Sequence, residues 1–139
     1  MTQRFLLSGV LVIAAVCVAQ SQTVKTTTAP YTSPASGKQM YKAYCASCHG
    51  LDGKGTGPAA TAMKAPLPDL TQLKKQNHGQ YPADHVAASI QGDTNNSSHG
   101  SAEMPVWGPV FRKVSGNHVG QVQLRVKNLN TYIESMQEK

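Results

Sequence analysis

The chain contains a five-residue stretch whose residue types and spacing could hold a metal-containing cofactor. Cys45 and Cys48 are separated by two residues, and His49 follows directly. On a helix these three side chains share one face, because residues three and four positions apart are neighbours. Two thiols placed in this way can add to the vinyl groups of a haem, while the imidazole reaches the iron. The pattern C-x-x-C-H therefore predicts haem c attached through Cys45 and Cys48, with His49 as an axial iron ligand.

Other uses of a cysteine pair remain open at this point. In an oxidising compartment, Cys45 and Cys48 could instead form a disulfide. A thioredoxin-like oxidoreductase would need alternating strands and helices, and the sequence near the pair has no run of β-branched alternation. A zinc site would lack a second cysteine pair, so histidines at irregular spacing would have to complete it. Those histidines are His78, His85, His99 and His118.

The N-terminal region of the 139-residue chain has the composition of an export signal. Arg4 precedes a mostly apolar run over residues 5–19, which is typical of a secretory signal peptide. The run is shorter than the roughly 20 residues that a membrane-spanning helix needs, so we expect cleavage. Residues 1–21 are predicted to be the signal peptide, 22–36 a flexible linker and 37–139 the folded domain. Export predicts a periplasmic protein without a membrane span after cleavage.

Apolar residues recur at helical spacing through the predicted domain, which indicates an all-α fold of three to five helices. The segment that leads into the cysteines is helical, and the segment 119–136 forms a last amphipathic helix. Between them, 69–76 and 82–91 are short helices, and 108–116 is a turn or helix. The loop 50–68 is rich in glycine, which lets backbone approach a flat porphyrin closely. The apolar residues expected to face the core or the haem are Leu70, Leu73, Val86, Ile90, Val122, Leu124, Val126, Leu129, Tyr132, Ile133 and Met136.

A methionine is the natural candidate for the second axial ligand. Pro105 biases Met104 away from helical backbone, and a methionine held extended in a loop can present its thioether to the iron. Met40 shares the helix of the cysteines, and Met136 belongs to the last helix, so neither suits the opposite side. Met63, in the glycine-rich loop, is the competing candidate. We therefore expect Met104 to be the distal ligand, with Met63 as the alternative.

These motifs resemble a known family, the class I (mitochondrial-type) cytochromes c. In that family a glycine and an aromatic residue of the first helix cross an apolar pair of the last helix. Gly37 and Tyr41 match the first pair, and Leu129 and Tyr132 match the second. The segment Met104-Pro105-Val106-Trp107-Gly108 is similar to the distal-ligand region of its bacterial members. The resemblance covers about residues 35–139 and implies one haem, since there is no second C-x-x-C-H.

The resemblance also implies a hydrogen-bond acceptor for the axial histidine. In the family, a Gly-Pro pair follows the motif, and the proline carbonyl accepts the second N–H of the imidazole. Gly57 and Pro58 stand at the matching place. Trp107 is expected to be a core aromatic near the haem, with an indole N–H available to a propionate.

The function implied is one-electron transfer by an exported cytochrome of a respiratory chain, without enzymatic activity. The alternatives are a haem enzyme or gas sensor with an open distal site, and a cytochrome subunit of a larger dehydrogenase or oxidase complex. The formal charge of the whole chain is +6. Loss of Arg4 with the signal and two haem propionates would lower it to about +3, a modest bias toward acidic surfaces of redox partner proteins. Scattered lysines and export argue against nucleic acid, and we expect a monomer or a transient complex.

Overall fold

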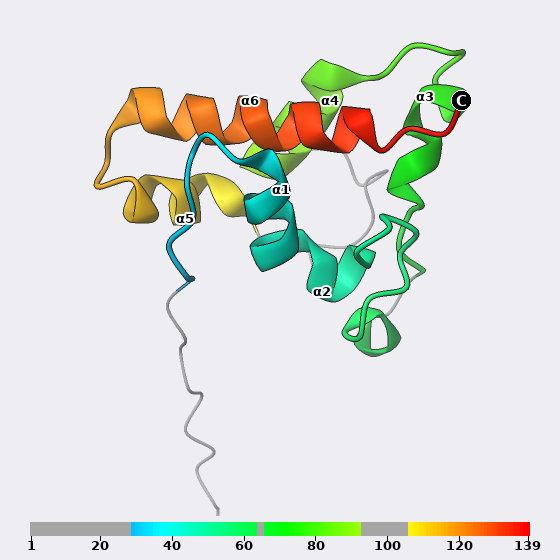
Figure 1. Ribbon diagram of the computed structural model, residues 1–139, viewed down its shortest axis with the longest axis horizontal. Coiled ribbons are helices and arrows are strands. Elements are labelled where there is room, and N and C mark those ends of the chain that lie inside the picture. Colours follow the sequence, from blue (N-terminus) through cyan, green and yellow to red (C-terminus); the bar gives the residue numbers. More distant parts are fainter. Residues whose placement is uncertain (1–28, 64–65, 93–105) are drawn as a thin grey trace, which may run out of the picture.

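The structure is a computed structural model that describes residues 29–63, 66–92 and 106–139. Within these ranges all regular secondary structure is helical, which confirms the predicted all-α fold (Figure 1). Apart from one isolated 3-10 turn, the helices of the described residues fall in five stretches, at the upper end of the predicted number. The predicted signal peptide, residues 22–28 of the predicted linker and Met104 lie outside the described residues, so those assignments stay predictions.

The first helical stretch runs without a break from Gly37 to His49 and carries the cysteine motif. It comprises α1 (Gly37–Met40), the π-helical turn η1 (Tyr41–Cys45) and α2 (Ala46–His49). The hydroxyl of Ser36 accepts a hydrogen bond from the Gln39 amide at 3.2 Å and so caps the start. A π-helical turn inside a helix is rare and is found frequently at functional sites. Here it ends on Cys45, the first residue of the motif.

The last helix, α6 (Val119–Ser135), packs against α1, α4, α5 and η3. Figure 1 shows it crossing over α1, with α4 and α5 alongside. A Cβ atom on Gly37 would come within 2.8 Å of the Tyr132 Cβ, so only glycine fits at the crossing. Leu129 is fully buried, and the rings of Tyr41 and Tyr132 are in contact. The expected pairing of Gly37 and Tyr41 with Leu129 and Tyr132 is confirmed.

The predicted middle helices are also present, and local capping residues set their ends. The 3-10 turn η3 (Leu70–Gln72) continues into α3 (Leu73–Gln76), and the Asp69 carboxylate accepts from the Thr71 amide at 2.9 Å. Helix α4 (Ala83–Gln91) follows and ends at Gly92, whose φ of 81° is left-handed. The glycine-rich loop is largely irregular, with one 3-10 turn, η2 (Ala60–Ala62).

Helix α5 (Trp107–Val114) closes one side of the core with an aromatic cluster. The ring of Trp107 lies 5.1 Å from that of Tyr44, measured between centroids, and Phe111 lies 5.7 Å from Tyr44. Phe111 is fully buried, whereas Trp107 is only partly buried. Because Tyr44 directly precedes Cys45, the cluster anchors α5 beside the cysteine motif. Trp107 packs against the core, as expected, and its place near a haem propionate stays a prediction.

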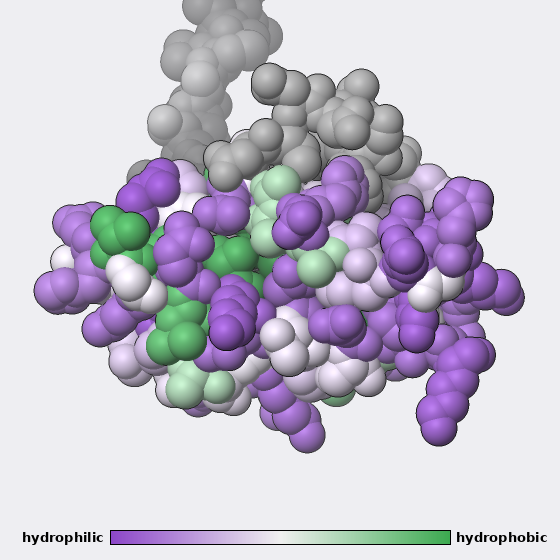
Figure 2. Space-filling view, turned by 90° about the horizontal axis from the view of Figure 1, so that it is seen from above, coloured by the Kyte–Doolittle hydropathy of each residue, from purple (hydrophilic) through white to green (hydrophobic). Residues whose placement is uncertain are grey.

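The face of the molecule seen in Figure 2 is mostly hydrophilic, and its apolar areas gather toward the end where α5 and the start of α6 lie. None of the described helices is both long enough and apolar enough to cross a membrane. The large hydrophobic side chains that are exposed are Tyr31, Leu51, Val106, Val119 and Leu124.

Candidate functional site

The three residues of the motif lie within about one helical turn, as their spacing predicts. Cys45 ends η1, and Cys48 and His49 form the last two positions of α2. Cys45 and His49 are buried, while Cys48 is partly exposed. Neither thiol is in a disulfide. The chain therefore presents two free thiols and a buried imidazole at the end of one helix.

The protonation behaviour of Cys45 bears on the oxidoreductase alternative. Burial, with a smaller contribution from nearby Cys48, raises the pKa of the Cys45 thiol to about 12. Reactive cysteines of disulfide oxidoreductases have lowered pKa values, because the thiolate is the nucleophile. A neutral, buried thiol is instead suited to packing against an apolar group. The burial of Cys45 thus argues against a role in disulfide exchange.

His49 is buried, and one of its two ring nitrogens lacks a hydrogen-bond partner among the described residues. Burial lowers the pKa of His49 below its usual value, and a contact with the Pro68 backbone opposes this shift. Among the described residues Nδ1 has no hydrogen-bond partner, and the backbone of Pro68 is the group near His49 that opposes the shift. A neutral imidazole is the form that binds metal. The buried, neutral ring is therefore suited to an axial ligand.

The contact with Pro68 corrects one expectation from the sequence. Pro58 was expected to supply the carbonyl for His49, but the group that acts on His49 is the backbone of Pro68. The segment around Pro58 instead binds the end of α2, where the Gly57 amide donates to the Cys48 carbonyl at 3.0 Å. The Ala59 amide likewise donates to the Ser47 carbonyl at 2.8 Å. These two bonds satisfy carbonyls that the end of α2 leaves free.

Glycine is required at Gly57 because the loop packs directly on the back of the motif helix. A Cβ atom there would lie 2.6 Å from the Ala46 carbonyl oxygen, closer than any ordinary contact. The Gly55 amide adds a third bond, to the His49 carbonyl at 2.8 Å. The loop thus covers the C-terminal end of α2, and the approach of its glycines to a porphyrin stays a prediction.

The end of the chain holds the segment after Pro68 in place, a role that sequence reasoning missed. The Glu138 amide donates to the Thr71 carbonyl at 3.0 Å, and the Gln137 side chain donates to the Leu70 carbonyl at 2.7 Å. Glu138 also forms a half-exposed salt bridge of 3.0 Å with Lys54. Figure 1 shows the C-terminus beside α3. No sequence signal joins these residues, because they are far apart along the chain.

The distal side of the site is described only in part. Met63 follows η2 and is partly buried, and Met104 lies outside the described residues. Helix α4 carries Val86 and Ile90, which are buried as expected. Leu70 and Leu73 are partly buried against the core, also as expected. The choice of distal ligand remains a prediction.

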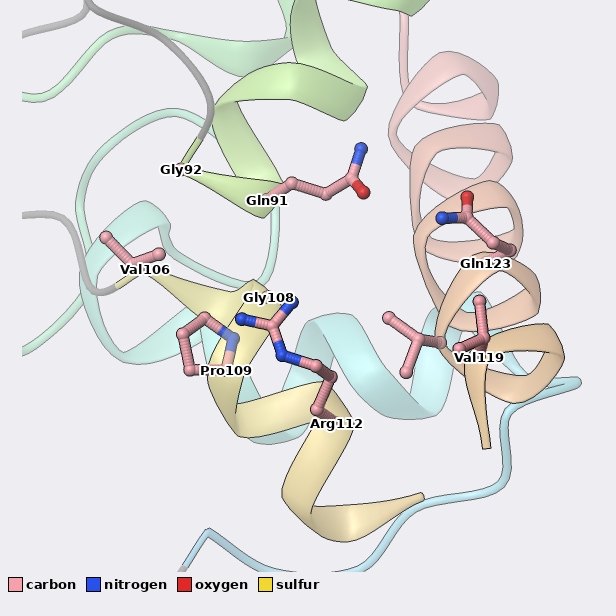
Figure 3. Close-up of a pocket in the computed structure, with 9 residues that line it drawn as sticks. Gln91, Gly92, Val106, Gly108, Pro109, Arg112, Val119 and Gln123 are labelled. Atoms are coloured by element: carbon pink, nitrogen blue, oxygen red, sulfur yellow. The ribbon is translucent and has the colours of Figure 1, made fainter. Parts of the chain in front are cut away.

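A cavity of about 300 Å³ lies elsewhere, between the end of α4, α5 and the start of α6. Figure 3 shows Gln91 and Gln123 on opposite sides of it, with Arg112 and Pro109 of α5 below. None of the cysteine-motif residues lines this cavity. It is therefore separate from the site at His49. The described residues also contain no group of three or more His, Cys, Asp or Glu side chains that could hold a metal ion.

Comparison with known proteins agrees with this geometry. The sequence model of the cytochrome c family matches residues 34–137, which is most of the chain. The protein therefore belongs to the cytochrome c family. No curated protein and no solved structure matches the chain. Members of this family bind haem c covalently through cysteines and transfer electrons with its iron, and Cys45, Cys48 and His49 fit that use.

Proposed function

We propose that the protein is a one-electron carrier whose haem c is attached at Cys45 and Cys48 and ligated by His49 and Met104. The observation that carries the proposal is the placement of two free thiols and a buried, neutral imidazole within one turn. The poorly satisfied Nδ1 of His49 supports it further, because ligation at the other ring nitrogen would draw the imidazole into a defined orientation.

The residues around the motif have defined tasks in this proposal. Burial favours the unprotonated form of His49, which is the form that ligates, and the Pro68 carbonyl would accept a hydrogen bond from the second ring nitrogen once the ring is held in place. The Tyr41 hydroxyl donates to the Gly50 carbonyl at 2.9 Å and so fixes the backbone directly after His49. A bound haem would supply the redox couple. The chain supplies ligands, orientation and exclusion of water.

Methionine as the second ligand distinguishes a carrier from a haem enzyme or gas sensor. Met/His ligation fills both axial positions and raises the reduction potential, which leaves no open position for a substrate. Pro105, directly after Met104, supports an extended backbone there. A free carrier and a fixed cytochrome subunit of a larger complex share these features, and the sedimentation behaviour of the native protein separates them.

Attachment is tested by following haem through denaturation. Purified protein should keep its haem in acid-acetone extraction and show a peroxidase-type stain after denaturing electrophoresis. Replacing both cysteines, Cys45→Ser with Cys48→Ser, should abolish retention. Replacing Ser47→Ala, between them and exposed, is the matched control and should leave retention unchanged. Haem that is lost from the wild type under these conditions would contradict the proposal.

We also propose that the protein is exported to the periplasm and meets acidic redox partners there. Arg4 followed by the apolar run 5–19 supports export. N-terminal sequencing of the mature protein tests this, since cleavage should fall near residue 21. The exposed lysines Lys74 and Lys75 on α3 support docking to acidic surfaces.

A further inference from the structure

The core of the domain contains a positively charged side chain whose burial the cysteine motif does not explain. Arg125 of α6 has no exposed surface, although arginine is almost never fully buried unless it is paired. Within the part of the chain that the structure describes, the one salt bridge joins Lys54 to Glu138, so Arg125 has no carboxylate partner there. The guanidinium remains charged in proteins. Arg125 is thus a buried positive charge without a counter-ion among the described residues.

The groups that surround Arg125 are neutral and come from three elements. Its Nε donates to the Ser115 hydroxyl at 2.9 Å, at the end of α5. Its Nη1 donates to the Thr32 hydroxyl at 3.0 Å and lies 3.8 Å from the Met40 sulfur of α1. The guanidinium carbon lies 5.4 Å from the centre of the Tyr31 ring. Nη2 has no hydrogen-bond partner among the described residues. Dipoles and a sulfur solvate the charge but do not neutralise it.

The charge is connected to the haem site through short contacts. Met40 lies five positions before Cys45 on the same helical stretch, roughly 7.5 Å along its axis. The Thr32 oxygen that accepts from Arg125 also lies 2.8 Å from the Tyr44 hydroxyl. Tyr44 directly precedes Cys45 and is buried. No water-exposed layer separates Arg125 from these side chains, because Met40 and Tyr44 are themselves core residues.

We propose that Arg125 raises the reduction potential of the haem by placing a permanent, buried positive charge next to the helix that carries it. This rests on the proposed attachment of haem at Cys45 and Cys48. One-electron reduction, with the electron supplied by a donor protein, lowers the positive charge at the iron by one. A nearby cation therefore favours the reduced state. A purely structural role would be served as well by an apolar side chain of similar volume, which often gives equal or better stability in a core.

The size of the effect follows from Coulomb's law. At an effective dielectric constant of about 20, a unit charge on the order of 10 to 15 Å away changes a one-electron equilibrium by about threefold to tenfold, allowing for some solvent screening. Tenfold corresponds to about 59 mV for a one-electron couple. Salt screens exposed charges but has little access to a buried one. A shift that persists at high ionic strength is therefore the signature of Arg125.

The experiment is a spectroscopic redox titration of haem-loaded variants against a reference couple. Arg125→Met should shift the equilibrium toward the oxidised state by about threefold to tenfold, equally at low and high salt. Arg125→Lys keeps the charge and should stay within about twofold of the wild type. Lys127→Gln removes an exposed charge from the same helix and is the matched control, with a shift under about twofold that high salt abolishes.

A second variant keeps Arg125 and neutralises its charge with an added carboxylate. Ser115→Asp places a carboxylate beside Nε and should shift the equilibrium in the same direction as Arg125→Met. If the Arg125→Met protein does not fold with covalently attached haem, the Ser115→Asp protein tests the proposal on its own. The proposal is overturned if both variants remain within about twofold of the wild type, or if their shifts vanish at high salt. Failure of the proposed function would look different, since the wild type would then carry no covalent haem to titrate.

Discussion

The rings of Tyr41 and Tyr132 lie with their centroids 5.4 Å apart, at the point where the first helical stretch crosses α6. This contact joins the beginning and the end of the domain. Burial, followed by the nearby Cys45, raises the pKa of Tyr41, so its hydroxyl stays protonated and donates to the Gly50 carbonyl. The crossing of two helices is thus connected to the backbone that leaves His49.

Gly37→Ala should destabilise the protein by about 1–3 kcal/mol, because the added Cβ would overlap the backbone and side chains of α6 at the crossing. Gly120→Ala is the matched control on α6, since a Cβ added there would meet no atom within 4 Å. That variant should gain about 0.5–1 kcal/mol from the better helix propensity of alanine. Denaturant unfolding of both variants measures the difference. Equal stabilities would contradict the close crossing.

Asp69→Ala should cost about 0.5–2 kcal/mol, because it removes the cap of η3 directly after Pro68. The hydrogen bond from the Thr71 hydroxyl is the largest cause of the lowered pKa of Asp69. A depressed pKa means that the charged form contributes stability above the unfolded value of about 3.9, and that this contribution is lost as the pH falls through the folded value.

Asp69→Asn isolates the charge, since asparagine also caps helices well. Its stability deficit relative to the wild type should be full at pH 7 and should vanish at acid pH, below the folded pKa of Asp69. Urea unfolding at a series of pH values measures this. A deficit that stays constant with pH would show that the Asp69 charge does not contribute.

Met104→Ala should remove the thioether–iron absorption band of the oxidised protein and open the iron to carbon monoxide. The reduction potential should fall by about 0.1 V or more, within the roughly 0.8 V that axial ligands control. Met63→Ala is the matched variant in the glycine-rich loop and should leave the band in place. If Met63→Ala removes the band and Met104→Ala does not, the distal ligand is Met63. Rapid binding of carbon monoxide by the wild type would favour the enzyme or sensor alternative.

Electron transfer to an acidic acceptor should slow as ionic strength rises, because screening acts beyond about 8 Å at physiological salt. Replacing both lysines of α3, Lys74→Gln with Lys75→Gln, should lower the second-order rate at low salt and weaken its salt dependence. Lys127→Gln, on α6, is the control, since Lys127 is also exposed. Stopped-flow kinetics measure these rates. A rate that is flat with salt in the wild type would indicate an apolar docking face.

Local sequence was sufficient to predict the helices and the cysteine motif. The spacing of Cys45, Cys48 and His49 sets their common face through helix geometry alone, and Asp69 and Gly92 cap their helices through their own backbone neighbours. Each of these features depends on residues within a few positions of one another. They need no knowledge of the rest of the fold.

Tertiary structure decided which distant groups meet. The sequence favoured Pro58 as the partner of His49, but the loop returns so that Gly53 accepts from Leu70 at 2.8 Å, and Pro68 reaches the histidine. The return depends on contacts from the far end of the chain, at Gln137 and Glu138. No local pattern encodes it.

The burial of two residues of α6 also could not be predicted from the sequence. The apolar pattern predicted that Leu124 lies on the buried face and gave no reason to expect Arg125 there, yet Leu124 is 40% exposed and Arg125 is fully buried. Helix geometry contained the signal, because Arg125 lies three positions after Val122 and four before Leu129. The prediction from sequence nevertheless left Arg125 off the buried face, because charged side chains usually face water. Only the packed structure shows that Thr32 and Ser115 solvate the guanidinium inside the core.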